Sequence, residues 1–155
     1  MAFTQNIQLE RTVDIKAPAD QVYNLVANVP KLGKLLPKLD RVVDEGDDVY
    51  RWEAEKVGIQ SYNIQTVYGA RYRYDPAARR VEWDPVPEIG NSRMGGFWQV
   101  DELGEGMSRL TFSTEAALHV PVPSLVKLAV GPLVKHEFVS AVERFLENIR
   151  SHLES

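Results

Sequence analysis

The sequence predicts an α+β fold, in which one antiparallel sheet presents one face to helices and the other face to water. Three observations favour this class. An alternating segment comes first and is followed by two short helical patterns, alternating segments between turn sequences fill residues 39–120, and a long helical pattern follows. We therefore expect seven strands, with two short helices between the first two strands and a long C-terminal helix.

The first strand is predicted for residues 7–15, "IQLERTVDI". Successive side chains of an extended chain point to opposite faces. Arg11 is the single polar residue on the predicted inward face, and the opposite face is polar throughout. The apolar residues of the inward face are Ile7, Leu9, Val13 and Ile15.

Two short helical elements follow. Residues 17–29, "APADQVYNLVANV", carry a short apolar stripe, and Pro18 suits an early helical position. Residues 30–39, "PKLGKLLPKL", predict a second short helix or turn bounded by Pro30 and Pro37.

Six further strands are expected as a meander between residues 39 and 120. The clearest of them is "LTFSTEAALHV" at residues 110–120. There Phe112 falls on the apolar face, which is predicted to be buried, and His119 falls on the face predicted to be exposed to solvent. The separating turn sequences are "EGDD" (45–48), "VGIQ" (57–60), "DPAARR" (75–80), "PEIGN" (87–91) and "LGEG" (103–106).

A long helical segment then runs to Leu153, with Val134 and Phe138 among its regularly spaced apolar residues. Gly131 and Pro132 interrupt this pattern. Proline inside a helix removes a backbone hydrogen bond and clashes with the preceding turn, so we expect a kink or a restart there.

Composition excludes several classes of protein. The chain has 155 residues, which suits a single domain over 1–155, and 44% hydrophobic with 26% charged residues is typical of a folded soluble protein. The absence of cysteine excludes disulfides and thiolate zinc sites. No signal-peptide pattern or membrane-length apolar run occurs, so a cytoplasmic location is expected. A net charge of -4 argues against nucleic-acid binding.

Metal-binding and catalytic motifs are not visible either. His119, His136 and His152 lie far apart, without the spacing that brings two imidazoles to one metal. Glu53 and Glu55 are predicted to point outward, so paired-carboxylate catalysis has no support. We expect no metal and no cofactor, and the sequence leaves any catalytic residue unassigned.

Aromatic residues gather on the inward face of two predicted neighbouring strands. Tyrosine and tryptophan each combine a large apolar body with one hydrogen-bonding group, which suits the wall of a ligand pocket. Plain core packing explains the same pattern equally well. The residues that share this face are Tyr50 and Trp52 in one strand and Tyr62, Ile64, Tyr68, Tyr72 and Tyr74 in the next.

Charged residues divide between the two faces. Arg11 and Lys56 occupy strand positions whose side chains are predicted to point inward. A charge that faces an apolar interior needs a partner. That partner would be a ligand's anionic group, an internal carboxylate or water at a cavity mouth. The arginines of residues 71–80 lie opposite the tyrosines, which favours a solvated sheet face over a phosphate-binding patch.

Three stretches carry a resemblance to a known family. They are "VDIKAPADQVYNLVANV" with "LLPKL" after it, "GGFWQV", and "GPLVKHEFVSAVERFLENI". In their order, over nearly the whole chain, the sequence is similar to the START-like or SRPBCC helix-grip superfamily, and most similar to its polyketide cyclase/dehydrase and coenzyme Q-binding branches.

The resemblance implies a curved seven-stranded antiparallel sheet around the long C-terminal helix, with a hydrophobic ligand between them. The fold and the aromatic pattern together give thirteen candidate ligand-binding residues. They are Arg11, Tyr50, Trp52, Lys56, Tyr62, Ile64, Tyr68, Tyr72, Tyr74, Trp98, Phe112, Val134 and Phe138.

Three functions remain open from the sequence. The first is a non-enzymatic carrier of a lipid, isoprenoid quinone, sterol-like compound or polyketide. The second is a polyketide cyclase or dehydratase, and the third is a protein-interaction module. The apolar stretch 121–134, "PVPSLVKLAVGPLV", is predicted to pack on the sheet or to form a lip for ligand entry or transient membrane contact.

Overall fold

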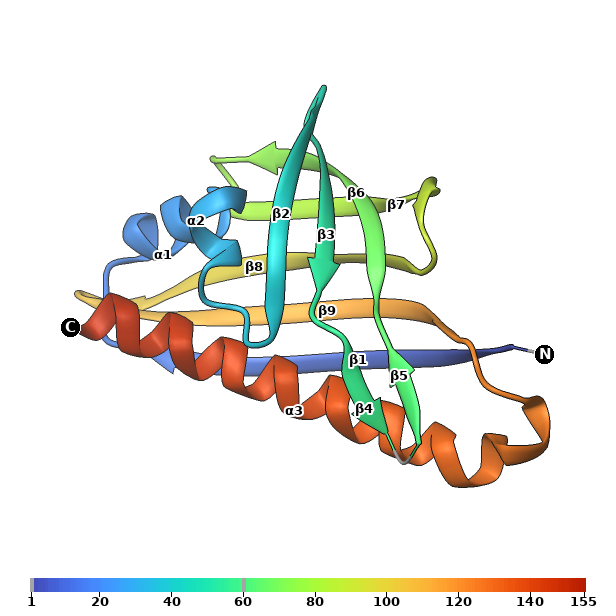
Figure 1. The fold of residues 1–155 in the computed structure, drawn as a ribbon. Coiled ribbons are helices and arrows are strands. Elements are labelled where there is room, and N and C mark those ends of the chain that lie inside the picture. The colour runs from blue at the N-terminus through green and yellow to red at the C-terminus, as the bar shows by residue number, and fades with distance from the viewer. Residues whose placement is uncertain (1, 60) are drawn as a thin grey trace.

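A computed structural model describes residues 2–59 and 61–155 of the chain. A curved antiparallel sheet wraps around one long helix (Figure 1). In chain order the elements are β1 (Phe3–Ile15), α1 (Ala19–Val26), α2 (Val29–Gly33), β2 (Leu39–Gly46), β3 (Val49–Ala54), β4 (Val57–Ile59), β5 (Tyr62–Ile64), β6 (Val67–Asp75), β7 (Arg80–Gly90), β8 (Arg93–Gly104), β9 (Met107–Val120), the 3₁₀ turn η1 (Ser124–Val126) and α3 (Lys127–Glu154).

The main sheet has seven strands in the order β1-β9-β8-β7-β6-β3-β2, and every neighbouring pair is antiparallel. The first strand therefore pairs with the last, from Phe3 opposite Val120 to Ile15 opposite Ser108. This long-range pairing places the first and the last strand side by side, and α3 packs against β1 at this edge of the sheet (Figure 1). The predicted α+β helix-grip class, with seven strands and two short helices after the first, is confirmed.

The connection between β3 and β6 differs from the prediction. Residues 57–60 were expected to form a turn, but Val57–Ile59 forms β4, which pairs with β5 as a separate two-stranded ribbon. The expected single strand over residues 61–74 is likewise divided into β5 and β6. The chain leaves the sheet after Ala54, whose N–H donates to the Thr66 carbonyl at 3.0 Å, and the ribbon reaches toward α3 (Figure 1).

Helix α3 is continuous from Lys127 to Glu154, with Pro132 inside it, so the expected restart is absent. Pro132 is the sixth residue of α3, so it removes the one backbone hydrogen bond that its position would give to the Leu128 carbonyl, and the helix continues past it. Its buried residues face the sheet at helical spacing. They are Val130, Gly131, Val134, Val142, Phe145, Leu146 and Ile149.

The short helices α1 and α2 close the end of the sheet near the C-terminus of α3 (Figure 1). The fully buried Ser108 hydroxyl donates to the Ala17 carbonyl at 2.6 Å, which ties β9 to the residues just before α1. Among the helices of the described residues, none combines the length and the apolar character needed to cross a bilayer.

Candidate functional site: an apolar cavity between the sheet and helix α3

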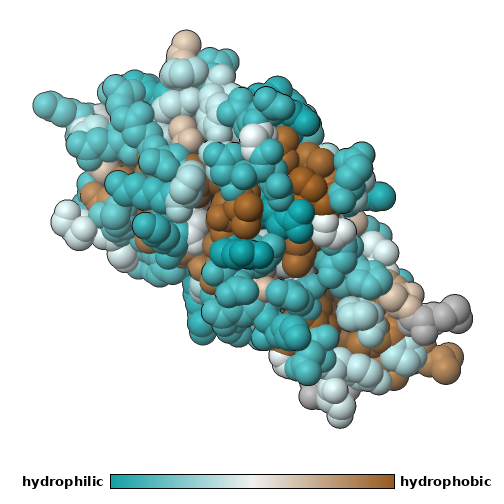
Figure 2. All heavy atoms as spheres, turned by 45° about the horizontal axis from the view of Figure 1, so that its top comes forward, coloured by the Kyte–Doolittle hydropathy of each residue, from teal (hydrophilic) through white to brown (hydrophobic). Residues whose placement is uncertain are grey.

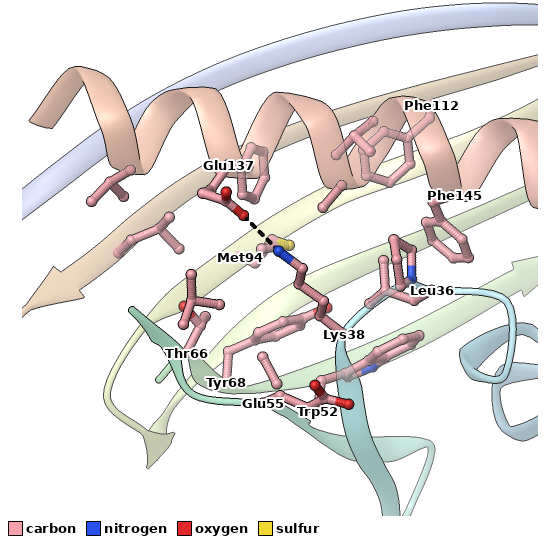
Figure 3. Close-up of a pocket in the computed structure, with 18 of the residues that line it drawn as sticks. Leu36, Lys38, Trp52, Glu55, Thr66, Tyr68, Met94, Phe112, Glu137 and Phe145 are labelled. Carbon is pink, nitrogen blue, oxygen red and sulfur yellow. Dashed lines mark hydrogen bonds and ion pairs between the residues drawn. The ribbon is translucent and has the colours of Figure 1, made fainter. Parts of the chain in front are cut away.

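A cavity of about 170 Å³, partly open to solvent, lies between the inner face of the sheet and α3 (Figure 3). Strands from β3 to β9, the α2 region and α3 all contribute to its wall. The residues that line it are Leu32, Leu36, Pro37, Lys38, Trp52, Ala54, Glu55, Val57, Ile64, Thr66, Tyr68, Tyr72, Trp83, Met94, Trp98, Phe112, Leu118, Val134, Glu137, Phe138, Ala141, Val142 and Phe145.

One wall of the cavity is built from cross-strand aromatic pairs of β3 and β6. Trp52 lies directly opposite Tyr68 in the antiparallel register, so their side chains share a face and their rings stack at 6.0 Å. The Trp52 indole Nε1–H donates to the Tyr72 hydroxyl oxygen at 3.0 Å. These contacts fix the orientation of all three rings.

The wall continues with aromatic residues of β7, β8 and β9, since Trp83 of β7 lies opposite Tyr72 with ring centroids 5.9 Å apart. Trp98 lies opposite Phe112 with ring centroids 4.6 Å apart, and Trp83 packs against both. From α3, the Phe145 ring meets Trp98 edge-on at 5.6 Å. The sheet and the helix therefore share one aromatic cluster.

The glycine opposite Trp83 makes room for this cluster. A side-chain carbon on Gly96 would lie 2.1 Å from the Ser113 carbonyl oxygen and 2.9 Å from the Trp83 ring. Both contacts are shorter than real carbon contacts allow. The "GGFWQV" stretch thus provides a glycine against which Trp83 packs as well as the cavity-lining Trp98.

Two tyrosine hydroxyls are the polar groups of the aromatic wall. The Tyr72 oxygen accepts the hydrogen bond from Trp52, so its own proton is left to donate elsewhere. The Tyr68 hydroxyl points into the pocket (Figure 3), and since no buried side-chain oxygen or nitrogen of the described residues lacks a hydrogen-bond partner, this oxygen is in reach of solvent in the cavity. Burial raises the pKa of Tyr68 and of Tyr72 above the usual value of about 10, so both are neutral donors at physiological pH.

The mouth of the cavity carries charged side chains. The Lys38 Nζ lies 3.2 Å from the Glu137 carboxylate and joins the segment before β2 to α3 (Figure 3). The Lys38 backbone has a φ of 57°, and its carbonyl accepts the Glu55 N–H at 2.8 Å. Because both side chains of the ion pair are about half exposed, the pair contributes little stability and is able to open.

The structure brings eight of the thirteen predicted residues together around the cavity. They come from β3, β5, β6, β8, β9 and α3, so the shared parity along the strands correctly grouped residues that are distant in sequence. The eight are Trp52, Ile64, Tyr68, Tyr72, Trp98, Phe112, Val134 and Phe138.

The two predicted charged residues lie outside the lining. Arg11 does share a face with the apolar residues of β1, but its guanidinium pairs with Glu143 of α3 at 3.4 Å in a half-exposed position. Lys56 is exposed, because β3 ends at Ala54 and the alternation of faces ends with it. Of the partners considered for Arg11, a carboxylate of the protein is the one observed.

Three predicted tyrosines also lie outside the lining. Tyr50 meets the Tyr72 ring edge-on at 5.8 Å, and Tyr74 stacks on Tyr72 at 6.2 Å, so both pack against a cavity residue. Tyr62 belongs to the β4–β5 ribbon, where it pairs with Ile59. Core packing describes Tyr50 and Tyr74 better than cavity lining does.

Sequence reasoning missed several lining residues. Trp83 and Met94 alternate with outward residues in β7 and β8, so the parity argument would have found them. Glu55 was predicted to point outward with Glu53, but it lies at the mouth because β3 has already ended. No pattern in the sequence indicates that Lys38 reaches Glu137.

Of the arginines at residues 71–80, Arg71 donates to the Asp47 carbonyl and the others pair with acidic side chains. Arg73 pairs with Glu82 and Asp84, and Arg79 pairs with Asp20. Within the described part of the chain, no cluster of three or more histidine, aspartate or glutamate residues is arranged to hold a metal ion. The cavity presents apolar rings, the hydroxyls of Thr66, Tyr68 and Tyr72, and charged side chains at its mouth.

A family model for polyketide cyclase/dehydrase and lipid transport proteins matches residues 6–154. The chain belongs to this family. The predicted resemblance to the polyketide cyclase/dehydrase branch is thereby confirmed. Membership of the polyketide cyclase/dehydrase and lipid transport family supports hydrophobic-ligand binding or a polyketide cyclase role. A comparison with curated proteins found no match.

Solved structures share the fold of this polyketide cyclase/dehydrase and lipid transport family member. The Zhui aromatase/cyclase from Streptomyces sp. R1128 is 20% identical, with a TM-score of 0.66 over 96% of this chain and 94% of that chain. A START superfamily protein from Mycobacterium smegmatis is 17% identical, with a TM-score of 0.68 over 95% and 97%. A conserved protein from Geobacillus kaustophilus is 14% identical, with a TM-score of 0.68 over 95% of both chains.

Proposed function

We propose that the protein binds and carries a small hydrophobic molecule that has a ring-sized apolar part and an oxygen able to accept a hydrogen bond. The observation that carries this proposal is the apolar cavity with the Tyr68 and Tyr72 hydroxyls in its wall. Apolar rings supply the driving force for burial, and a few well-placed polar groups fix the orientation of a ligand.

The volume of the cavity limits how much of a ligand is enclosed. A cavity of roughly 150 Å³ lined by apolar side chains accepts benzene, and this cavity measures about 170 Å³. One aromatic ring or a short acyl segment therefore fits. The rest of a larger lipid, quinone or polyketide extends through the mouth, where opening of the Lys38–Glu137 pair widens the passage.

The hydroxyls favour a ligand oxygen over a purely hydrocarbon ligand. A ligand that fills the cavity displaces water from the tyrosine hydroxyls, and a ligand carbonyl or ether oxygen restores one of the hydrogen bonds lost to water. Tyr68 is the stronger candidate, because its hydroxyl points into the cavity and, unlike that of Tyr72, accepts no hydrogen bond from Trp52. Tyr72 donates only the proton that its bond from Trp52 leaves available.

A cyclase or dehydratase is the second candidate. It is supported by family membership and by tyrosine donors that would polarise a carbonyl in a folded chain. The carrier comes first because the acids and bases among the lining residues, Lys38, Glu55 and Glu137, all lie at the mouth. The ionisable groups of the aromatic wall are the hydroxyls of Tyr68 and Tyr72. Burial raises the pKa of both, which makes them poorly suited to proton transfer near neutral pH.

Native mass spectrometry of protein purified from its own host tests the proposal. The wild-type protein is expected to retain a hydrophobic, oxygen-containing molecule in stoichiometric amount. Ala141→Leu, which fills the cavity from α3, should lose it, whereas Arg144→Leu on the exposed side of α3 should keep it. Retention by both variants would contradict the proposal, and a bound molecule recovered as a cyclised or dehydrated product of an added precursor would favour the enzyme.

A further inference from the structure

The segment around the start of α3 exposes large apolar side chains. Leu125 and Leu128 are 94% and 93% exposed, and Leu133 is 40% exposed. Only Leu103 is comparable among the other large apolar residues that the structure describes. In Figure 1 this orange segment projects at the lower right, and Figure 2 shows brown apolar residues at that projecting end.

Packing against the sheet does not account for these leucines. Val126, Val130 and Val134 recur every four residues and form the inward stripe of this segment, with Val130 fully buried. Leu125 of η1 and Leu128 of the first turn of α3 lie outside this stripe and are almost fully exposed. The segment therefore has two apolar faces, and the core uses only one of them.

The local charge differs in sign from that of the whole protein. The chain has a net charge of -4, yet no aspartate or glutamate occurs between Glu115 and Glu137. Lys127 and Lys135 are exposed within this stretch. Exposed leucines beside lysines, without nearby acidic residues in the sequence, match the chemistry of an anionic lipid surface.

We propose that the leucine face, defined as Leu125, Leu128 and Leu133 with Lys127 and Lys135, docks on the surface of an anionic membrane. The leucines enter the boundary between headgroups and acyl chains, and the lysines approach the anionic headgroups. A second copy of the chain fits less well, because a twofold contact through this face would bring lysines of like charge together.

The leucine face lies next to the mouth of the cavity along α3. Leu133 immediately precedes the cavity residue Val134, and Glu137 of the mouth follows one turn later. A docked protein would hold the mouth close to the membrane surface. The docking proposal itself does not rest on the proposed ligand.

Vesicle flotation of the full-length protein tests the docking proposal. The probes are vesicles of phosphatidylcholine alone and vesicles of phosphatidylcholine and phosphatidylglycerol in equal parts. Wild-type protein is expected to float with the anionic vesicles. Leu125→Ser combined with Leu128→Ser should lower partitioning about tenfold or more, since each leucine loses its transfer out of water.

Two controls distinguish docking through the leucine face from nonspecific adsorption to vesicles. Leu103→Ser removes an exposed leucine at the end of β8 and should leave partitioning unchanged. Lys127→Gln combined with Lys135→Gln should abolish the preference for anionic vesicles. The proposal would be overturned if Leu103→Ser lowered partitioning as much as Leu125→Ser with Leu128→Ser does. It would also be overturned if the wild-type protein did not float with anionic vesicles. A wild-type dimer that Leu125→Ser with Leu128→Ser converts to monomers would assign the face to a second copy instead.

Discussion

The Trp52 indole N–H donates a hydrogen bond of 3.0 Å to the Tyr72 hydroxyl oxygen, and both side chains are almost completely buried. The bond links β3 to β6 through side chains inside the cavity wall. Because the Tyr72 oxygen accepts this bond, the Tyr72 hydroxyl proton remains available for donation to another group. The same pair therefore contributes both to folding and to the proposed binding of a ligand oxygen.

Tyr72→Phe is expected to lower the free energy of unfolding by about 1–3 kcal/mol, because the Trp52 N–H loses its acceptor inside the protein. Tyr74→Phe is the matched control, since no hydrogen bond to a described residue is made by its half-buried hydroxyl. Urea denaturation measures both variants. Equal destabilisation by the two substitutions would show that the Trp52–Tyr72 bond is not specifically stabilising.

Gly96→Ala is expected to lower stability by roughly 2 kcal/mol or more, since its new methyl group meets the Ser113 carbonyl and the Trp83 ring. Gly58→Ala offers a control in a strand, because the nearest atom to its new carbon is 3.8 Å away. Thermal unfolding with tryptophan fluorescence follows both stability and the surroundings of Trp83. A neutral Gly96→Ala would mean that the strands relax around position 96.

Stability should decrease as pH rises above about 10. Burial raises the pKa of Tyr68 and Tyr72 above the usual value and that of Tyr74 to about 12, so the folded protein keeps protons that the unfolded chain releases. The stabilisation is complete below about pH 10 and is lost as pH rises through the folded pKa values, with a slope of about 1.4 kcal/mol per pH unit for each such tyrosine.

Tyr68→Phe provides the test of this alkaline effect. The variant should unfold with a shallower loss of stability between about pH 10 and 12 than the wild type. Urea denaturation across this range measures the slope. An identical slope in the wild type and in Tyr68→Phe would show that Tyr68 has the same pKa in both states.

Filling the cavity should separate ligand binding from folding. Ala141→Leu adds an apolar side chain to a helix position that faces empty space, and leucine is a good helix former, so stability should stay within about 1 kcal/mol of the wild type or rise. Binding of a ring-sized ligand should fall at least about tenfold. A variant that binds as tightly as Arg144→Leu would place the binding site elsewhere.

Where strands are long and regular, the alternation of side chains along the sequence correctly predicted which residues are buried. In β9, Leu110, Phe112 and Leu118 are buried and His119 is half-buried, as the period of two requires. Phe112 and Trp52 were placed in the cavity on this basis. The two short helices and the long C-terminal helix followed from apolar spacing and proline positions.

The prediction was wrong where an element ended earlier than its sequence pattern. Lys56 continues the alternation of β3 in sequence, but the chain leaves the sheet after Ala54 and starts the β4–β5 ribbon. The contact between Lys38 and Glu137 depends on how α3 lies across the sheet. Such contacts result from tertiary packing, and the local sequence does not encode them.

The most direct test of the proposed function compares two ligands of nearly equal size, acetophenone and ethylbenzene, which differ by a carbonyl oxygen. Isothermal titration calorimetry with wild-type protein and Tyr68→Phe measures all four affinities. We predict that Tyr68→Phe weakens acetophenone binding about 3- to 10-fold, the value of one neutral hydrogen bond, and leaves ethylbenzene binding unchanged. Equal affinities of acetophenone for the two proteins would contradict the claim that the Tyr68 hydroxyl recognises a ligand oxygen.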